Sequence, residues 1–269
     1  MPRPARSPRN SAAAPSTPWR WALAGLCLGV LPALLLWAPA RWLAGTVTQA
    51  SGAQVQLVNA RGTVWQGSAL LLLTGGAGSH DRAALPTRLQ WRLRPTWTGL
   101  QAWLQSDCCT PAPLRLYAQP GWGSVRLELA DGHSQWPAAL LAGLGTPWNT
   151  LQPQGQLQLA TTGLRLQWTQ GRTSVQGRAQ LDALAMSTSL STLRPMGSYR
   201  LQLEGGSAAQ LTLSTLGGAL LLSGSGHWVG QRLRFTGEAS AAPGREAALA
   251  NLLNIIGRRN GARSLITVG

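Results

Sequence analysis

Hydrophobic and polar residues alternate along most of the chain beyond residue 53, in short runs that Gly, Pro or Ser interrupt. Alternation with a period of two is typical of strands that bury one face and expose the other. The runs predict strands at Gln54–Val58, Gly62–Trp65, Ser68–Thr74, Thr87–Leu93, Leu114–Tyr117, Ser124–Leu129, Gly155–Ala160, Leu164–Thr169, Arg172–Leu181, Gly197–Glu204, Ala209–Ser214, Gly218–Gly224, Gln231–Ala239 and Ser264–Val268.

Two stretches follow a helical period instead. Trp136–Leu144 is short and apolar, and Arg245–Ile256 carries one apolar stripe along a helix. Gly257 stands where a C-terminal glycine cap is expected, and Arg258 and Arg259 suit the negative end of the helix dipole. The stripe consists of Leu249, Leu252, Leu253 and Ile256.

The strand pattern repeats weakly along the chain. Residues 155–181 resemble residues 220–239, and each unit is interpreted as a hairpin with a glycine at its bend. Stacked hairpins build a long, curved antiparallel sheet, which buries one face. We therefore predict a mainly β fold with a repeat-like sheet and one or two short helices. Those helices, a partner protein or lipid are the candidates to cover the buried face.

An uncharged stretch of 20 residues runs from Trp21 to Ala40. A helix of that length is about 30 Å long, which matches the hydrocarbon core of a bilayer. Indole rings prefer the headgroup level, and tryptophans stand at both ends of the stretch. The arginines are biased to its N-terminal side, with Arg3, Arg6, Arg9 and Arg20 before it and Arg41 after it.

The arginine bias places the N-terminus in the cytoplasm. We predict a disordered basic cytoplasmic tail over residues 1–20, a single inner-membrane helix over residues 21–42 and a periplasmic β-rich domain over residues 43–269. A cleaved signal peptide is the alternative. The length of the apolar stretch and the proline in Ala38-Pro39-Ala40 favour an uncleaved anchor.

The chain is strongly basic, with a net charge of +15 and 23 arginines but no lysine. Its hydrophobic fraction of 44% excludes a compositionally disordered protein. A basic periplasmic domain could contact anionic lipid headgroups or acidic proteins, and no nucleic acid is expected there. Because no run exceeds two arginines, solvated arginines dispersed over strand faces are the simpler explanation.

Few residues offer catalytic chemistry. The three histidines lie far apart, the eight acids are scattered singly, and no nucleophile elbow, phosphate-binding loop or dinucleotide motif occurs. We therefore predict that the protein is not an enzyme and has no catalytic, cofactor-binding or metal-binding residues. The isolated ionisable residues are His80, His133, His227, Asp81, Asp107, Glu128, Asp131, Asp182, Glu204, Glu238 and Glu246.

Tryptophan and cysteine raise two further questions. Nine of the 13 tryptophans lie in the predicted domain and could bind hydrophobic or sugar ligands, although packing between strands is the favoured interpretation. Cys108 and Cys109 are adjacent, and a disulfide between neighbours is uncommon, so the redox state of the pair stays open. The nine tryptophans are Trp65, Trp91, Trp97, Trp103, Trp122, Trp136, Trp148, Trp168 and Trp228.

Two passages carry a more specific signal. Residues 57–69 contain a G-T-V-W-x-G-x-A pattern, and a W-x-L-x-P pattern follows at residues 91–95. Residues 252–261 read Leu-Leu-Asn-Ile-Ile-Gly-Arg-Arg-Asn-Gly. With a single predicted membrane helix before them, these passages resemble the protein N family of the type II (general) secretion pathway. The resemblance rests on Gly62, Trp65, Gly67, Trp91, Pro95 and Gly257.

The resemblance implies a non-enzymatic accessory or assembly component of type II secretion in a Gram-negative inner membrane, partnered with other inner-membrane platform proteins. The family also resembles the AsmA-like group of β-rich envelope proteins. That likeness implies an alternative, a lipid- or amphiphile-binding protein with an apolar groove on its curved sheet. A polysaccharide-active enzyme is the third and least favoured hypothesis, because it needs two carboxylates about 5–10 Å apart.

Overall fold

A computed structural model describes residues 19, 23, 25–26, 28–30, 36–169, 172–230 and 232–269. The chain divides into two compact units, Met1–Ala38 and Pro39–Gly269. The predicted tail and most of the predicted membrane helix (residues 21–42) lie outside the described residues. No helix within the described ranges is long and apolar enough to cross a membrane.

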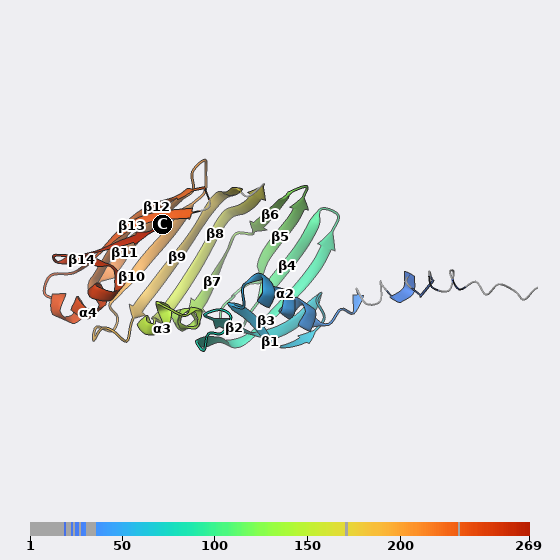
Figure 1. Ribbon diagram of the computed structural model, residues 1–269, viewed down its shortest axis with the longest axis horizontal. Helices are drawn as coiled ribbons and strands as arrows, with labels where there is room; N and C mark the ends of the chain where they lie inside the picture. The colour runs from blue at the N-terminus through green and yellow to red at the C-terminus, as the bar shows by residue number, and fades with distance from the viewer. Residues whose placement is uncertain are drawn as a thin grey trace, which may run out of the picture. The chain divides into compact units, whose positions relative to one another are not determined.

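The second unit is built on one antiparallel sheet of 15 strands, which is twisted and curved (Figure 1). Strand order follows chain order almost throughout, so the predicted mainly β, antiparallel fold is confirmed. The strands are β1 (Val55–Gly62), β2 (Gln66–Thr74), β3 (Arg82–Thr96), β4 (Gly99–Gln105), β5 (Leu114–Gly121), β6 (Ser124–Leu129), β7 (Gly132–Pro137), β8 (Gln154–Thr169), β9 (Arg172–Ser187), β10 (Gly197–Glu204), β11 (Gln210–Gly218), β12 (Leu220–Val229), β13 (Arg232–Ala241), β14 (Arg258–Asn260) and β15 (Arg263–Val268).

Four strand predictions need correction. Gly62–Trp65 is not a strand, because β1 ends at Gly62 and residues 63–65 connect it to β2. The strands β4, β7 and β14 were not predicted. In β4 the apolar side chains alternate as expected, but the large Trp103 stands among the polar ones and blurs the pattern.

Gly163 does not bend a hairpin. It lies inside the continuous strand β8, in the left-handed region with φ 56°, where the pairing with β9 shifts by one residue. Such a bulge bends a strand without ending it. Opposite Gly163, strands β6 and β7 pair with β8 in a single register and form two halves of one interrupted strand. The Asp131 carboxylate accepts a hydrogen bond from the Gly163 amide at 2.6 Å across this interruption.

Pairing across the strands places side chains on two chemically distinct faces. Residues that pair directly in an antiparallel sheet share a face. The side chains on one side of the sheet, which we call the apolar face, include the row Leu159, Leu181, Leu201 and Leu213. The neighbouring row Gln158, Asp182, Arg200 and Ser214 lies on the opposite side, which we call the polar face. The predicted alternation of apolar and polar residues therefore gives the sheet one apolar face and one polar face.

Helices cover part of the apolar face. Within the described part of residues 39–269 these helices are α2 (Ala40–Ala50), the 3-10 helix η1 (Ala138–Leu144), α3 (Trp148–Leu151) and α4 (Glu246–Ile256). The predicted helices correspond to η1 and α4, whereas α2 and α3 were not predicted. In α4 the predicted stripe is buried at Leu249, Leu252 and Leu253, which pack with Tyr199 and Leu220 of the sheet.

Gly257 does not cap α4 in the left-handed conformation. Its φ of −168° is extended, and Arg258 and Arg259 begin β14 rather than close the helix. A side chain at Gly257 would approach the Leu265 carbonyl oxygen to 2.5 Å. Glycine is therefore required for the close approach of two backbones, not for a positive φ.

The residues of the G-T-V-W-x-G-x-A pattern meet Trp91. The Trp91 indole donates a hydrogen bond to the Val64 carbonyl oxygen at 3.0 Å and packs with Ala69 and with Ala40 of α2. Gly67 leaves room for the ring, because a Cβ there would lie 2.5 Å from Trp91 Cζ2. The pattern thus builds the small core beneath α2.

Gly67→Ala should lower the free energy of unfolding by about 1–3 kcal/mol, because the added methyl overpacks the Trp91 ring. Chemical denaturation of the full chain would measure the loss. Gly206→Ala is the matched control, since a Cβ at Gly206 meets nothing within 4 Å. Equal stability of the two variants would contradict this account of the motif.

Candidate functional site

The strands have a helix end and a turn end. The helix end holds η1, α3 and α4, and the turn end holds the turns β3–β4 and β5–β6 and the facing ends of β8 and β9, along the upper rim of the sheet in Figure 1. The three hydrophobic clusters of the described chain lie around α4, beneath α2 and beside η1. The apolar face is therefore filled at the helix end.

The apolar face is open at the turn end. Val125 and Trp168 are paired there across β6 and β8 and are 47% and 41% exposed. Five leucines at the turn end of this face, spread over β6, β8, β10, β11 and β13, are half-buried and, among the described residues, belong to none of the three clusters. Apolar surface that no helix or cluster covers is typical of an interaction site. These leucines are Leu127, Leu166, Leu203, Leu211 and Leu233.

The polar face carries ion pairs between neighbouring strands. Among the described residues, carboxylates and guanidinium groups meet at 2.8–3.2 Å in four pairs. Most of these side chains are well exposed, so each pair contributes little to stability. The four pairs are Glu128 with Arg165, Glu204 with Arg178, Asp182 with Arg200 and Glu238 with Arg263.

Asp182 has the strongest of these contacts. Arg200 donates two hydrogen bonds of 2.8 Å to its carboxylate, and these bonds lower the pKa of Asp182 below its ordinary value. The side chain of Asp182 is 14% exposed and that of Arg200 is 37% exposed. A partly exposed pair of this geometry holds β9 to β10 on the polar face.

Asp182→Asn should cost about 1–2 kcal/mol of unfolding free energy at pH 7. A carboxylate with a lowered folded-state pKa stabilises the fold above its unfolded pKa of about 3.9, and this contribution disappears as the pH falls through the folded-state pKa. The difference between wild type and variant should therefore shrink below about pH 4. Denaturation across pH would measure it, with Glu204→Gln as the control in a more exposed pair. A difference that does not change with pH would contradict this mechanism.

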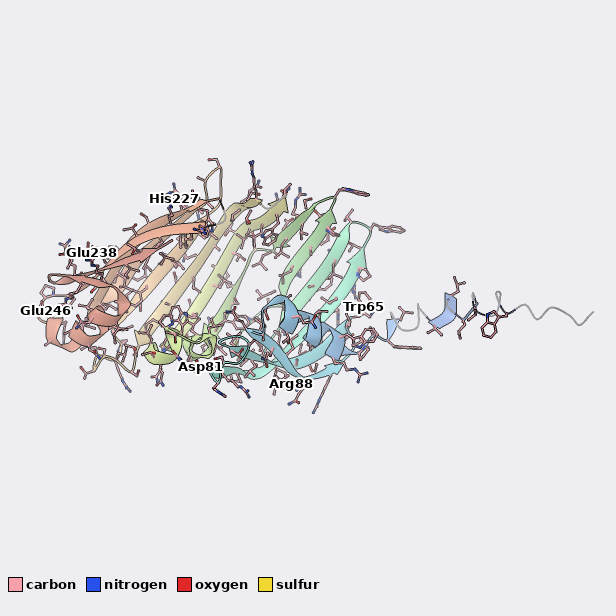
Figure 2. The ribbon with its side chains drawn as sticks, viewed as in Figure 1. Trp65, Asp81, Arg88, His227, Glu238 and Glu246 are labelled. Carbon is pink, nitrogen blue, oxygen red and sulfur yellow. A yellow bond between two sulfur atoms is a disulfide. The ribbon has the colours of Figure 1, made fainter. Side chains whose placement is uncertain are left out.

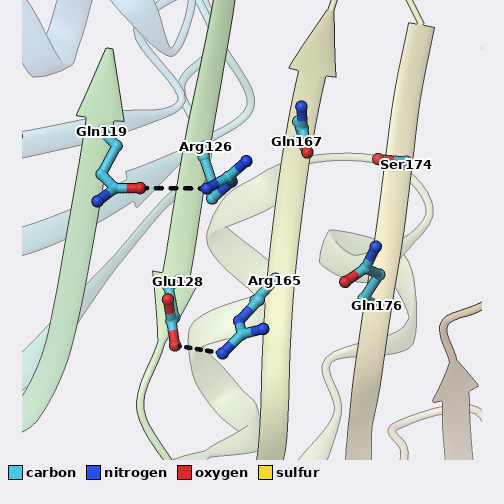
Figure 3. A pocket seen from close by; sticks show the side chains of 7 residues that line it. All are labelled: Gln119, Arg126, Glu128, Arg165, Gln167, Ser174 and Gln176. Carbon is cyan, nitrogen blue, oxygen red and sulfur yellow. Dashed lines mark hydrogen bonds and ion pairs between the residues drawn. The ribbon is translucent and has the colours of Figure 1, made fainter. Parts of the chain in front are cut away.

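A shallow hollow of about 440 Å³ lies on the polar face (Figure 3). Its seven lining side chains come from β5, β6, β8 and β9, and Glu128 is the only carboxylate among them. Arg165 pairs with Glu128 at 3.2 Å, and Arg126 donates to the Gln119 side chain at 3.4 Å. The hollow therefore lacks the two carboxylates that the glycosidase hypothesis requires.

The isolated histidines and acids stay apart in the fold. His227 lies near the turn end and Asp81 at the helix end (Figure 2). Asp81 accepts a hydrogen bond from the Asn149 amide at 3.0 Å, and Glu246 accepts one from the Gly244 backbone at 3.2 Å. Among the described residues, no three His, Cys, Asp or Glu side chains form a group that could hold a metal ion.

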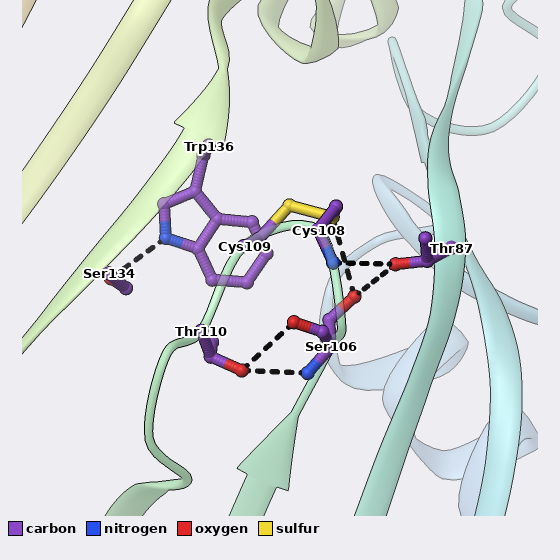
Figure 4. The surroundings of a disulfide bond; sticks show 7 residues. All are labelled: Thr87, Ser106, Cys108, Cys109, Thr110, Ser134 and Trp136. Carbon is purple, nitrogen blue, oxygen red and sulfur yellow. Dashed lines mark hydrogen bonds between the residues drawn. A yellow bond between two sulfur atoms is a disulfide. The ribbon is translucent and has the colours of Figure 1, made fainter.

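Cys108 and Cys109 form a disulfide in the loop between β4 and β5 (Figure 4). The Cys108 amide donates to Thr87 Oγ1 of β3 at 3.3 Å, and the Cys109 carbonyl accepts from the Gln135 amide of β7 at 2.7 Å. Cys109 is buried against Leu85 and Leu140. The disulfide loop therefore joins β3 to β7 where these strands do not pair directly.

The tryptophans divide into packed and exposed residues. Trp91 and Trp136 belong to the cores, as the packing interpretation predicts, and Trp103 lies 5.6 Å from the guanidinium of Arg94. Trp97 and Trp122 contradict that interpretation, because both are fully exposed at turns. Both residues lie in turns between strands, so the packing between strands that buries other tryptophans does not reach them.

One comparison with known proteins gives a match. A family model described as "Type II secretion system (T2SS), protein N" matches residues 53–266, from just before β1 into β15. No curated protein and no solved structure matches the chain.

Proposed function

Because the chain belongs to the type II secretion system protein N family, we propose that it is a non-enzymatic accessory or assembly component of that system in the inner membrane. Family membership, which confirms the resemblance of the motifs around Trp65 and Gly257, supports a role in type II secretion. The finer proposal is that residues 21–42 anchor the chain and that residues 43–269 act in the periplasm with other platform proteins.

Two features of the chain support this placement. The uncharged residues from Trp21 to Ala40, with their excess of arginines on the N-terminal side, suit a single inner-membrane span. Disulfides persist in oxidising compartments such as the periplasm, and the Cys108–Cys109 bond lies in the part proposed to act there.

Isolation from native membranes tests the platform role. A tag on the full chain should recover other inner-membrane secretion proteins after mild solubilisation. The control keeps residues 1–38 and carries an unrelated periplasmic domain in place of residues 39–269. Recovery of the same proteins by both chains, or by neither, would overturn the proposal that the β-rich domain makes the contacts.

A second candidate function is favoured by the open turn end of the apolar face. We infer that this half of the sheet binds the hydrocarbon part of a lipid or another amphiphile. Leucines such as Leu127, Leu166 and Leu211 offer dispersion contacts without hydrogen-bonding groups, as acyl chains require. The polar face supplies the soluble exterior of such a module.

A further inference from the structure

Trp97 and Trp122 occupy the tips of two hairpins. Trp97 lies in the turn between β3 and β4, and Trp122 lies in the turn between β5 and β6. Their exposures of 106% and 107% show that neither ring packs against the sheet. A tryptophan exposes a large apolar surface when it is left in water, so two such rings point to a partner.

The two tips are neighbours. Strand β4 pairs with β5, with Leu100 opposite Ala118, so the second hairpin follows the first directly in the sheet. A hollow of about 840 Å³ opens between the two hairpins and is lined by Trp97 of the first turn and by residues of β5 and β6 such as Pro120 and Val125. From Val125 the apolar surface continues to Trp168 and the open apolar face.

Exposed arginines accompany the tips. Arg94 and Arg126 lie within three residues of the β3–β4 and β5–β6 turns, and Arg172 begins β9 at the same end of the sheet. The nearest acid on these hairpins is Glu128, which is paired with Arg165 at 3.2 Å. The turn end of this part of the sheet thus presents indole rings together with uncompensated positive charge.

We propose that the tips of hairpins β3–β4 and β5–β6 dock onto the surface of an anionic phospholipid bilayer. Indole rings prefer the headgroup level, where their apolar body and N–H group are both satisfied. Arginines near an anionic membrane surface gain electrostatic attraction to lipid phosphates. The proposal does not depend on which of the two proposed functions holds.

The surroundings of the rings favour a bilayer over a protein pocket. Energetic centres of protein interfaces are ringed by further side chains that exclude water. Trp122 instead stands between Gly121 and Gly123, and Trp97 stands between Thr96 and Thr98. Isolated rings on separate tips suit a soft, planar partner into which each can insert alone.

Photocrosslinking of the full chain tests this surface. The chain is reconstituted into vesicles of equal parts phosphatidylcholine and phosphatidylglycerol, with p-benzoylphenylalanine in place of Trp97 or Trp122. The control carries the same residue in place of Trp148, which is exposed at the helix end. Mass spectrometry should find phospholipid adducts at positions 97 and 122 at least about tenfold above position 148, as interfacial aromatics predict.

Removal of the arginine charges and the identity of the crosslinked molecules provide two further tests of the proposal. Replacing Arg94, Arg126 and Arg172 together by Gln should reduce the adducts at positions 97 and 122 by about tenfold or more, because each arginine adds attraction to the anionic surface. Arg258→Gln with Arg259→Gln is the matched control on β14. Equal adducts at position 148, an absence of lipid adducts, or crosslinks at positions 97 and 122 to protein alone in native membranes would overturn the proposal.

Discussion

Leu252→Ala should lower the free energy of unfolding by about 2–5 kcal/mol, the range found when a buried leucine is truncated. Leu252 is 1% exposed and lies between Leu249 and Leu253 in the cluster that joins α4 to the sheet. Its loss removes dispersion contacts and leaves a cavity, because the sheet beneath α4 is held by strand pairing and relaxes little.

Ile255→Ala is the matched control for Leu252→Ala. Ile255 belongs to the same helix but is 46% exposed, so its truncation should have a much smaller effect. Chemical denaturation of the full chain, followed by circular dichroism, would compare the variants. A Leu252→Ala variant as stable as Ile255→Ala would show that α4 does not hold the C-terminal strands.

Leu211→Asp should weaken amphiphile binding at least about tenfold, because a carboxylate on the apolar contact surface must lose its hydration. Leu211 pairs with Leu203 on the open turn end of the apolar face. It belongs to none of the described clusters, so the substitution should leave the fold intact. Labelling by a photoreactive fatty acid in membranes that carry the full chain would measure the loss.

The neighbouring position supplies the control. Thr212→Asp adds the same charge one residue along β11, on the polar face opposite Ser225. Fatty-acid labelling should be unchanged in this variant. If Leu211→Asp were labelled as strongly as Thr212→Asp, the amphiphile-binding candidate would be wrong, while the family assignment would stand.

Local patterns in the sequence determined most of the elements. Alternation located most of the strands and separated the two faces, since neighbouring side chains of a strand point to opposite sides whatever the strand pairs with. The apolar stripe from Leu249 to Ile256 located α4, because residues three and four apart lie on the same side of a helix. A glycine in the sequence does not by itself identify its structural role, because a bend, the bulge at Gly163 and the close approach of backbones at Gly257 all require glycine.

The sequence also indicated the family through Gly62, Trp65, Gly67 and Trp91, and the structure gives Gly62, Gly67 and Trp91 a physical role. Gly62 adopts a φ of 89° at the turn into β2, and Gly67 makes room for the Trp91 ring. A pattern that needs particular residues for close packing is more specific than composition. The predicted membrane helix over residues 21–42 stays a prediction.

Only the tertiary structure decided how the elements combine. The contacts of the Cys108–Cys109 loop with Thr87 and Gln135, the cover of α4 over Tyr199 and the open turn end all depend on residues far apart in the chain. The same holds for the tryptophans, since burial of Trp91 requires Gly67 and Ala69, whereas Trp97 has no such neighbours at its turn. The direction of a side chain is a local property of the backbone, but what covers it is set by long-range contacts that no local period encodes.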